Sequence, residues 1–399
     1  MTAIYVHIPF CLQRCNYCDF NTYTGLLSLE DDYVGALLHE IALRAERNSD
    51  AVAQTLYFGG GTPSLLQLDG LVSVVGAVRR YLDLPNDAEV TLEANPGTVN
   101  RSYLDGLREA GVTRLSIGVQ SSHSHELVML GRLHSWQDAV DCLRMAREAQ
   151  FESVSFDLMY GLPGQTLHQW LETVDRVVAL GPDHLSLYAL TLGSGTPLSE
   201  VLAYSDIELP DDDVAADMYE AAAERLHTAN FWQYEISNWA HAPSPAPQIW
   251  ALPPQGMTEE IGPHISHHNL MYWRNESWLG FGAGAHSWFR GRRWSNYPHP
   301  ETYIHAMRSE QLRGFYDEVI SPDLERGETM MMGLRLAEGV TDQRFYERFQ
   351  LHLRDAYGQI IDRVCSFGLA SWDGERLRLT PRGRLLGNQV FQEFLLMEA

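Results

Sequence analysis

The stretch HIPFCLQRCNYCDFN, residues 7–21, holds three of the five cysteines of this 399-residue chain. These three residues, Cys11, Cys15 and Cys18, have the spacing Cys-x3-Cys-x2-Cys. A structural zinc site takes four protein ligands, and no fourth ligand follows nearby, whereas a redox pair needs only two thiols. Three thiolates suit a 4Fe–4S cluster, because they hold three of its irons and leave the fourth iron open. The spacing therefore predicts such a cluster on this loop.

The other two cysteines, Cys142 and Cys365, lie in the stretches AVDCLRMARE and IIDRVCSFGL. Both contexts indicate the apolar side of a helix, so we expect these thiols to be buried and not to bind metal. Five cysteines, mostly clustered, are also too few for a disulfide framework.

Outward from the cysteine loop, short β-rich runs alternate with longer amphipathic stretches such as 31–47 and 135–149. This alternation predicts βαβ units and a parallel sheet, hence an α/β fold that is either a doubly wound sheet or an incomplete barrel. In such folds the carboxyl ends of the strands carry the ligands, so we expect the functional residues there. The β-rich runs are 3–8, 54–60, 88–95, 113–120, 153–161 and 184–191.

The pattern changes after residue 195, so we divide the chain into 1–195, 196–310 and 311–399. The segment 241–264 contains six prolines, which exclude a regular helix or a central strand. We expect it to be an exposed, mobile insertion. The last region reads as helices followed by a hairpin that turns at Asp373-Gly374 and then a terminal helix, a small α+β domain similar to a winged helix.

The composition excludes several classes of function. The formal net charge is −23, from 52 acidic and 29 basic residues, whereas nucleic-acid binders usually present a basic face to phosphates. No apolar run is long enough to cross a bilayer. The first ten residues lack the basic and apolar regions of a signal peptide. We therefore expect a cytoplasmic protein without a nucleic-acid partner or an integral membrane segment.

Two further motifs accompany the cysteine loop. FGGGTPS, residues 58–64, follows the second predicted strand, and EANPGT, residues 93–98, ends the third. Together with the cysteines they resemble the radical S-adenosylmethionine (SAM) superfamily, which implies a partial (β/α)6 barrel over 1–195 that 196–310 completes. The resemblance also implies that SAM chelates the open iron. The residues that it implies for SAM are Tyr5, Tyr17, Gly60, Gly61, Thr62, Glu93, Gln120, Arg132 and Asp157.

Within the superfamily, the chain resembles anaerobic coproporphyrinogen III dehydrogenase, with a HemN-like domain at 311–399. It departs from that enzyme where Phe20 replaces a fourth cysteine and where the cysteine loop begins only at residue 11. Both departures are features of the related heme chaperones of the HemW type. So is HNLMYW, residues 268–273, which resembles their His-Asn-x-x-Tyr-Trp motif for heme.

This second resemblance implies that His268 binds heme iron and that Tyr272 and Trp273 contact the macrocycle, with Trp278 as a further apolar face. His264 and His267 are alternative iron ligands. We expect arginines near the motif to meet the heme propionates, because a guanidinium pairs well with a carboxylate. These arginines are Arg274, Arg290, Arg292 and Arg293. Without the resemblance, each of these side chains would read as an ordinary surface or core residue.

The sequence thus favours a heme chaperone that passes heme to an acceptor heme protein and carries a 4Fe–4S cluster and SAM. The alternatives are an oxygen-independent coproporphyrinogen III dehydrogenase and, more weakly, a radical SAM enzyme acting on an unrelated substrate. A one-electron donor such as flavodoxin or ferredoxin is an expected partner, and the sequence leaves a homodimer open.

Overall fold

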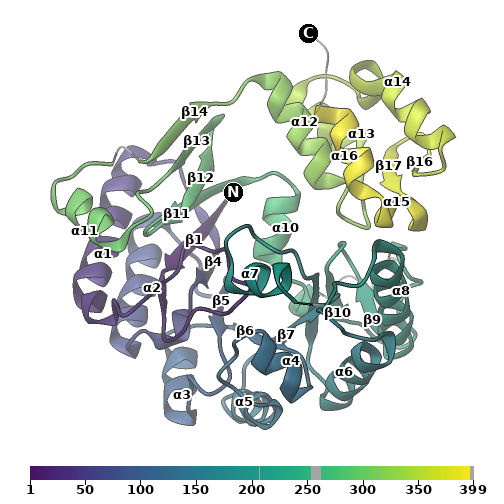
Figure 1. Ribbon diagram of the computed structural model, residues 1–399. Helices are drawn as coiled ribbons and strands as arrows, with labels where there is room; N and C mark the ends of the chain where they lie inside the picture. Colours follow the sequence, from purple (N-terminus) through teal and green to yellow (C-terminus); the bar gives the residue numbers. More distant parts are fainter. Residues whose placement is uncertain (206, 253–261, 313, 396–399) are drawn as a thin grey trace.

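The computed structural model describes residues 1–205, 207–252, 262–312 and 314–395 (Figure 1). Six parallel strands lie side by side in chain order, and each coincides with one of the predicted β-rich runs. Helices connect them, as the alternation predicts, so the α/β fold with a partial (β/α)6 barrel is confirmed. The strands are β1 (Thr2–Ile8), β4 (Ala53–Gly60), β5 (Glu89–Ala94), β6 (Arg114–Gln120), β7 (Ser153–Tyr160) and β8 (His184–Ala189). The longer helices are α1 (Glu30–Arg47), α2 (Leu68–Leu82), α3 (Arg101–Glu109), α5 (Trp136–Glu148), α6 (Leu167–Leu180) and α8 (Asp212–Thr228).

Further strands extend the sheet at both sides. Beside β1 lies β11 (Ser277–Phe281), also parallel, followed by the antiparallel strands β12 (His286–Phe289), β13 (Arg292–Ser295) and β14 (Tyr316–Val319). Beyond β8 lie the antiparallel strands β10 (Asn238–His241) and β9 (Phe231–Gln233). Strands β14 and β9 end the sheet and do not pair with each other, so the barrel stays open.

The parallel strands are buried on one side under helices and face a cavity on the other. On β6, Leu115, Ile117 and Val119 are fully buried in the main hydrophobic core, while the alternate residues, beginning with Arg114 and ending with Gln120, line the cavity. This division follows from the period of two in a strand, where successive side chains point to opposite faces. Polar residues on alternate positions of the strands can therefore meet inside the barrel.

The helix α10 (His267–Trp273) contains the HNLMYW motif and packs against β1, β4 and β11. Its amino terminus is held by Glu89, whose carboxylate accepts the backbone N–H of His267 at 2.8 Å and of His268 at 2.9 Å. Glu89 begins β5, and Thr55, which bonds His268, lies near the start of β4. The helix therefore crosses the amino-terminal ends of the strands, opposite to the cysteine loop at their carboxyl ends.

The last part of the chain has a hydrophobic core of its own and appears as a separate lobe in Figure 1. The hairpin turns at Asp373-Gly374 as predicted, and β15 completes a three-stranded sheet. The single terminal helix predicted from the sequence is instead two helices, α15 and α16. The elements are α12 (Pro322–Gly333), β15 (Val340–Thr341), α13 (Asp342–Phe349), α14 (Leu353–Ser366), β16 (Ala370–Trp372), β17 (Arg376–Leu379), α15 (Pro381–Leu385) and α16 (Gly387–Leu395).

The prediction that 241–264 is exposed holds for only some of the described residues: His241, Ser244, Pro245, Gln248 and Leu252 are exposed, but other residues are buried. Ala242, Ala246 and Trp250 are all buried. The Trp250 ring packs in the core of the C-terminal lobe, and its indole N–H donates to the carbonyl of Leu379 at 2.9 Å. Prolines prevent regular structure here, but they do not prevent burial of the apolar residues between them. Residues 253–261 lie outside the described part of the chain.

Within the described part of the chain, no helix combines the length and the apolar character that a membrane span requires.

The remaining elements are short. The short elements are β2 (Phe10–Cys11), β3 (Tyr23–Thr24), α4 (Ser124–Met129), α7 (Pro197–Ala203), α11 (Pro300–Arg308) and the 3-10 helices Leu27–Leu29, Pro63–Leu65 and Gly262–His264.

Candidate functional site

A cavity of about 830 Å³ lies on the inner face of the barrel. The three cysteines of the loop line it, together with every residue that the sequence implicated in SAM binding. These residues come from β1, the cysteine loop, the strands β4 to β7 with the turns that follow them, and the loop after α4, so the fold collects them from distant parts of the chain. They are Cys11, Cys15, Cys18, Tyr5, Tyr17, Gly60, Gly61, Thr62, Glu93, Gln120, Arg132 and Asp157.

Each cysteine has a polar neighbour. Cys11 Sγ lies 3.7 Å from the hydroxyl of Thr62, and Cys18 Sγ lies 3.9 Å from the hydroxyl of Thr22. Cys15 Sγ accepts a hydrogen bond from Arg132 Nη1 at 3.4 Å.

Burial raises the pKa of Cys11, so its thiolate needs a positive partner such as iron. No three His, Cys, Asp or Glu side chains in the described ranges are arranged around one metal ion. A donor set of three thiols with a cationic guanidinium beside one of them suits a polynuclear cluster better than a single zinc ion.

The glycines of FGGGTPS bring the end of β4 against the cysteine strand. Gly60 has a φ of +116°, and a Cβ there would lie 2.5 Å from the imidazole ring of His7. A Cβ on Gly61 would lie 2.6 Å from the carbonyl oxygen of Phe10. Only glycine allows this close approach. Because the N–H of Thr62 donates to the same carbonyl at 2.9 Å, the turn is fixed beside Cys11.

Glu93 is a half-buried carboxyl group at the end of β5. It accepts hydrogen bonds from the hydroxyl of Tyr57 at 2.8 Å and from the N–H of Gly60 at 3.2 Å. Burial raises its pKa to about 7, and the nearby charge of Asp157 adds to this effect. A ligand with a positive charge would favour the ionised form of Glu93.

The residues expected at later strand ends are held by hydrogen bonds. Arg132 donates to the side chain of Asn95 and to the carbonyl of Gly118. Asp157 accepts from the hydroxyl of Ser116 at 2.9 Å. Gln120 has a positive φ of 68° where the chain leaves β6.

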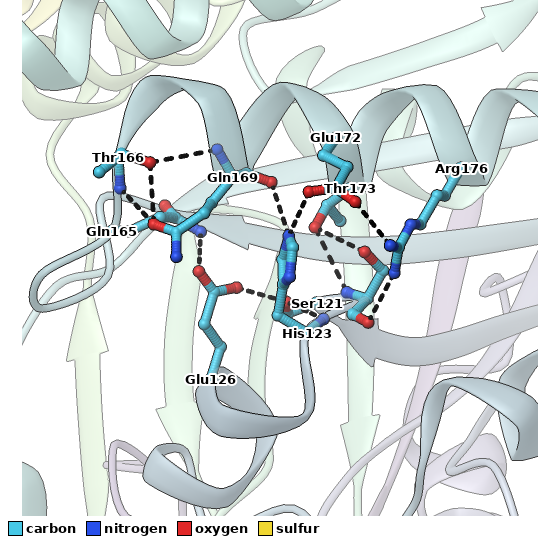
Figure 2. A network of polar contacts seen from close by, with 10 residues as sticks. Ser121, His123, Glu126, Gln165, Thr166, Gln169, Glu172, Thr173 and Arg176 are labelled. Atoms are coloured by element: carbon cyan, nitrogen blue, oxygen red, sulfur yellow. Dashed lines mark hydrogen bonds and ion pairs between the residues drawn. The ribbon is translucent and has the colours of Figure 1, made fainter.

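The loop after Gln120 is fixed from outside the cavity by a polar network (Figure 2). The hydroxyl of Ser121 donates to Glu126 and accepts the N–H of His123 at 3.0 Å. The amide of Gln165 donates to the other oxygen of Glu126 at 3.1 Å. The network joins α4 to the start of α6 and so fixes the backbone that presents Gln120 to the cavity.

Three residues of HNLMYW, His268, Asn269 and Tyr272, face the same cavity from the opposite end. His268 Nδ1 lies 2.8 Å from the hydroxyl of Thr55, and His268 Nε2 lies 3.3 Å from the hydroxyl of Tyr272. Burial lowers the pKa of His268 to about 3, so the imidazole is neutral. Tyr272 and Trp278 also line the cavity and pack edge-to-face with their ring centroids 5.2 Å apart.

Several residues expected to bind heme or its propionates lie outside this cavity. Trp273 does not line the cavity; its ring lies under the guanidinium of Arg335 on the side of α10 facing the C-terminal lobe. His264 and His267 also lie outside the cavity, and His267 Nε2 bonds the carbonyl of Gly262. None of the four arginines expected at the propionates lines the cavity. They form the ion pairs Arg274–Glu338, Arg290–Asp50, Arg292–Asp317 and Arg293–Glu328.

Sequence reasoning missed several polar residues that line the cavity. Two of them, Arg114 and His184, begin predicted strands, and His7 lies within another. Strand periodicity could have found these residues. Side chains two positions apart on a strand point to the same face, and each of the three shares its face with a recognised site residue on its own strand or on a paired strand. Nothing in the local sequence marks His286 or Asn238, which reach the cavity only through the antiparallel strands β12 and β10.

The chain is similar to proteins of known family over its whole length. Residues 5–177 match the radical SAM superfamily, and residues 320–386 match the HemN C-terminal domain. The heme chaperone HemW of Bacillus subtilis is 34% identical over 99% of each chain. HemW of Mycobacterium tuberculosis is 37% identical over 98% of this chain and 94% of its own. The structure of coproporphyrinogen III oxidase (HemN) from Escherichia coli has the same fold, with a TM-score of 0.82 at 23% identity over 99% of this chain and 90% of that chain.

Proposed function

Because this chain belongs to the HemW family of radical SAM proteins, we propose that it is a heme chaperone that binds heme in its barrel cavity and passes it to an acceptor heme protein. The position of His268 is the observation that supports this site for heme. Its imidazole lines the same cavity as the three cysteines. Heme and the cluster would thus share one enclosed space.

The hydrogen bonds of His268 suit a side chain that would hold a heme iron. The hydroxyl of Thr55 donates to Met271 Sδ at 3.6 Å, so its oxygen is left to accept the N–H of His268 Nδ1. The lone pair then lies on Nε2, which is the atom that an iron ion requires. The hydroxyl of Tyr272 lies 3.3 Å from Nε2, and this long contact would give way if His268 held a heme iron.

The walls near His268 suit a flat apolar ring. The ring of Tyr57 stacks on the imidazole, with 5.0 Å between the centroids, and Tyr272 and Trp278 add aromatic surface. Burial of apolar area contributes about 25 cal/mol per Å². Most of the affinity for heme should therefore come from burial of the macrocycle, and the iron–nitrogen bond should fix its position.

The other end of the cavity would hold the cofactors that the superfamily implies. Cys11, Cys15 and Cys18 would bind three irons of a 4Fe–4S cluster. When bound, the reduced cluster supplies one electron for cleavage of SAM. The chain itself would position SAM with Tyr5, Tyr17, Gly60, Gly61, Thr62, Glu93, Gln120, Arg132 and Asp157, all of which line the cavity.

We extend the proposal to partners and location. A one-electron donor such as flavodoxin or ferredoxin would reduce the cluster, and an apoprotein would accept the heme. The strongly acidic composition is consistent with a protein of the cytoplasm that binds no nucleic acid. A homodimer remains part of the proposal.

One observation favours a second candidate, a coproporphyrinogen III dehydrogenase. The fold is that of HemN from Escherichia coli over nearly the whole chain. Against it stands Phe20, which lines the mouth of the cavity with 64% of its surface exposed. This residue occupies the position of the fourth cysteine in the dehydrogenase, so the chain lacks one of the features that the enzyme carries.

Hemin titration of the cluster-loaded protein tests the proposal. We expect stoichiometric binding with a Soret band of protein-ligated iron, and no decarboxylation of coproporphyrinogen III with SAM and a reductant. His268→Ala should shift the Soret band and raise the dissociation constant. His267→Ala is the matched control, because its ring lies outside the cavity, and it should bind hemin as the wild type does. Efficient turnover, or a Soret band indifferent to His268→Ala, would contradict the assignment.

A further inference from the structure

A buried arginine with two unbonded guanidinium nitrogens lines the cavity. Arg114, the first residue of β6, lines the cavity and is only 3% exposed. Its Nε and Nη2 atoms are buried and make no hydrogen bond to any residue that the structure describes. The other two arginines of the cavity differ in this respect. Arg14 donates to the carbonyls of Cys18 and Phe20, and Arg132 donates to the groups described above.

Two carboxylates on the strands beside Arg114 are bound to other donors. Asp157 accepts from the hydroxyls of Ser116 and Ser186. Glu89 accepts from two backbone N–H groups of α10. Among residues 1–205, 207–252, 262–312 and 314–395, no carboxylate forms an ion pair with Arg114 (the pairs that occur there involve other cations). A guanidinium cannot lose its proton in a protein. The chain therefore keeps a permanent positive charge in the cavity, and this is unfavourable unless something neutralises it.

Asp157 interacts electrostatically with Arg114 without a hydrogen bond or ion pair between the two, and the histidines beside Arg114 add no opposing charge. His184 is buried, and its two nitrogens bond the hydroxyls of Ser155 and Tyr234 at 2.7 and 2.8 Å. Burial and the charge of Arg114 lower the pKa of both His184 and His268, so both rings are neutral. The amides of Asn238 and Asn269 line the same region and can add hydrogen bonds to a ligand. This end of the cavity is thus prepared for an anion.

We propose that Arg114 binds a carboxylate of the cavity's ligand, namely a propionate of heme. This inference rests on the proposed function and identifies the group that orients the macrocycle once His268 holds the iron. The planar fork of a guanidinium matches a carboxylate with two parallel hydrogen bonds, and such charge-assisted bonds are the strong ones. Arg114 would thus make the propionate contact that we expected, from the sequence, of four other arginines. Those four form ion pairs elsewhere: Arg274, Arg290, Arg292 and Arg293.

The test compares hemin with hemin dimethyl ester, in which both propionates lose their charge. The cluster-loaded wild type should bind hemin roughly tenfold to a hundredfold more tightly than the ester, as expected for a hydrogen-bonded charge pair. Arg114→Gln should lose this preference, so that both ligands bind with the affinity that the wild type has for the ester. Arg114→Lys should retain part of it, because it keeps the charge but not the fork. Arg274→Gln, which removes a paired arginine beside the heme motif, should keep the full preference.

The outcomes separate this inference from the proposed function. If the wild type binds hemin and its ester equally, the propionate contact is wrong while heme binding stands. If it binds neither, the proposed function fails. If Arg114→Gln weakens SAM binding and leaves the preference for hemin unchanged, the carboxylate belongs to SAM and our inference is overturned.

Thermal unfolding without ligand tests whether Arg114 instead serves to stabilise the folded protein. Removal of an uncompensated charge should raise the melting temperature of Arg114→Gln above that of the wild type. A lower melting temperature together with loss of hemin affinity would assign Arg114 to the fold and overturn the inference.

Discussion

Replacement of Glu93 by glutamine should stabilise the SAM-free protein at alkaline pH while weakening SAM binding. Burial raises the pKa of Glu93 from 4.5 to about 7. The folded state therefore holds the proton more tightly than the unfolded state does. The favourable contribution of this group is complete below the unfolded pKa and is lost as the pH rises through 7. At about 1.4 kcal/mol per pKa unit, the ionised carboxylate costs the fold about 3 kcal/mol at pH 8 and less than about 1 kcal/mol at pH 5.

Glutamine has the shape of the protonated acid and no charge, and its amide oxygen can still accept the N–H of Gly60. Urea denaturation of the cluster-loaded wild type and Glu93→Gln proteins, both without SAM, should show the variant more stable by about 3 kcal/mol at pH 8 and nearly unchanged at pH 5. SAM titrations of the same samples, followed by the EPR spectrum of the reduced cluster, should show weaker binding by the variant.

Glu235 provides the matched control. Burial also raises its pKa to about 7, but its carboxylate bonds the backbone of Ser237 and the amide of Asn238 and does not line the cavity. Glu235→Gln should show a pH-dependent stabilisation of the same sign and leave SAM binding unchanged. The reasoning is refuted if Glu93→Gln is no more stable than the wild type at pH 8, or if it gains equally at both pH values.

Two further predictions concern the cluster and the Pro-rich segment. Anaerobically reconstituted Cys15→Ala should lose its iron and brown colour, while Cys142→Ala, a change in the helical core, should keep about four irons per chain; iron retained by Cys15→Ala would overturn the cluster assignment. Trp250→Ala should destabilise the protein by about 3–5 kcal/mol, as loss of a large buried side chain does, measured by urea denaturation; a change below about 1 kcal/mol would mean that the segment is only loosely packed.

The sequence alone determined the features that depend on local pattern. Strand periodicity and the alternation with helices predicted the six parallel strands β1 and β4 to β8 within a few residues, but not the parallel strand β11, because these signals come from neighbours along the chain. The cysteine spacing and the glycine motif predicted the cluster loop and the SAM-side residues, since the carboxyl ends of parallel strands meet at one edge of a sheet. All of those residues line one cavity.

Only the tertiary structure decided which side chains near HNLMYW face that cavity. On a helix, residues one position apart point about 100° away from each other, so His268 and Tyr272 enter the barrel while Trp273 turns to the C-terminal lobe. The sequence contained no sign of this, because the direction of a short helix is set by what it packs against. Likewise, the four arginines expected at the propionates form ion pairs with distant acids and lie outside the cavity, whereas Arg114 lines it without an ion pair among the described residues. Charge partners far apart along the chain are chosen by the fold, and local sequence does not encode them.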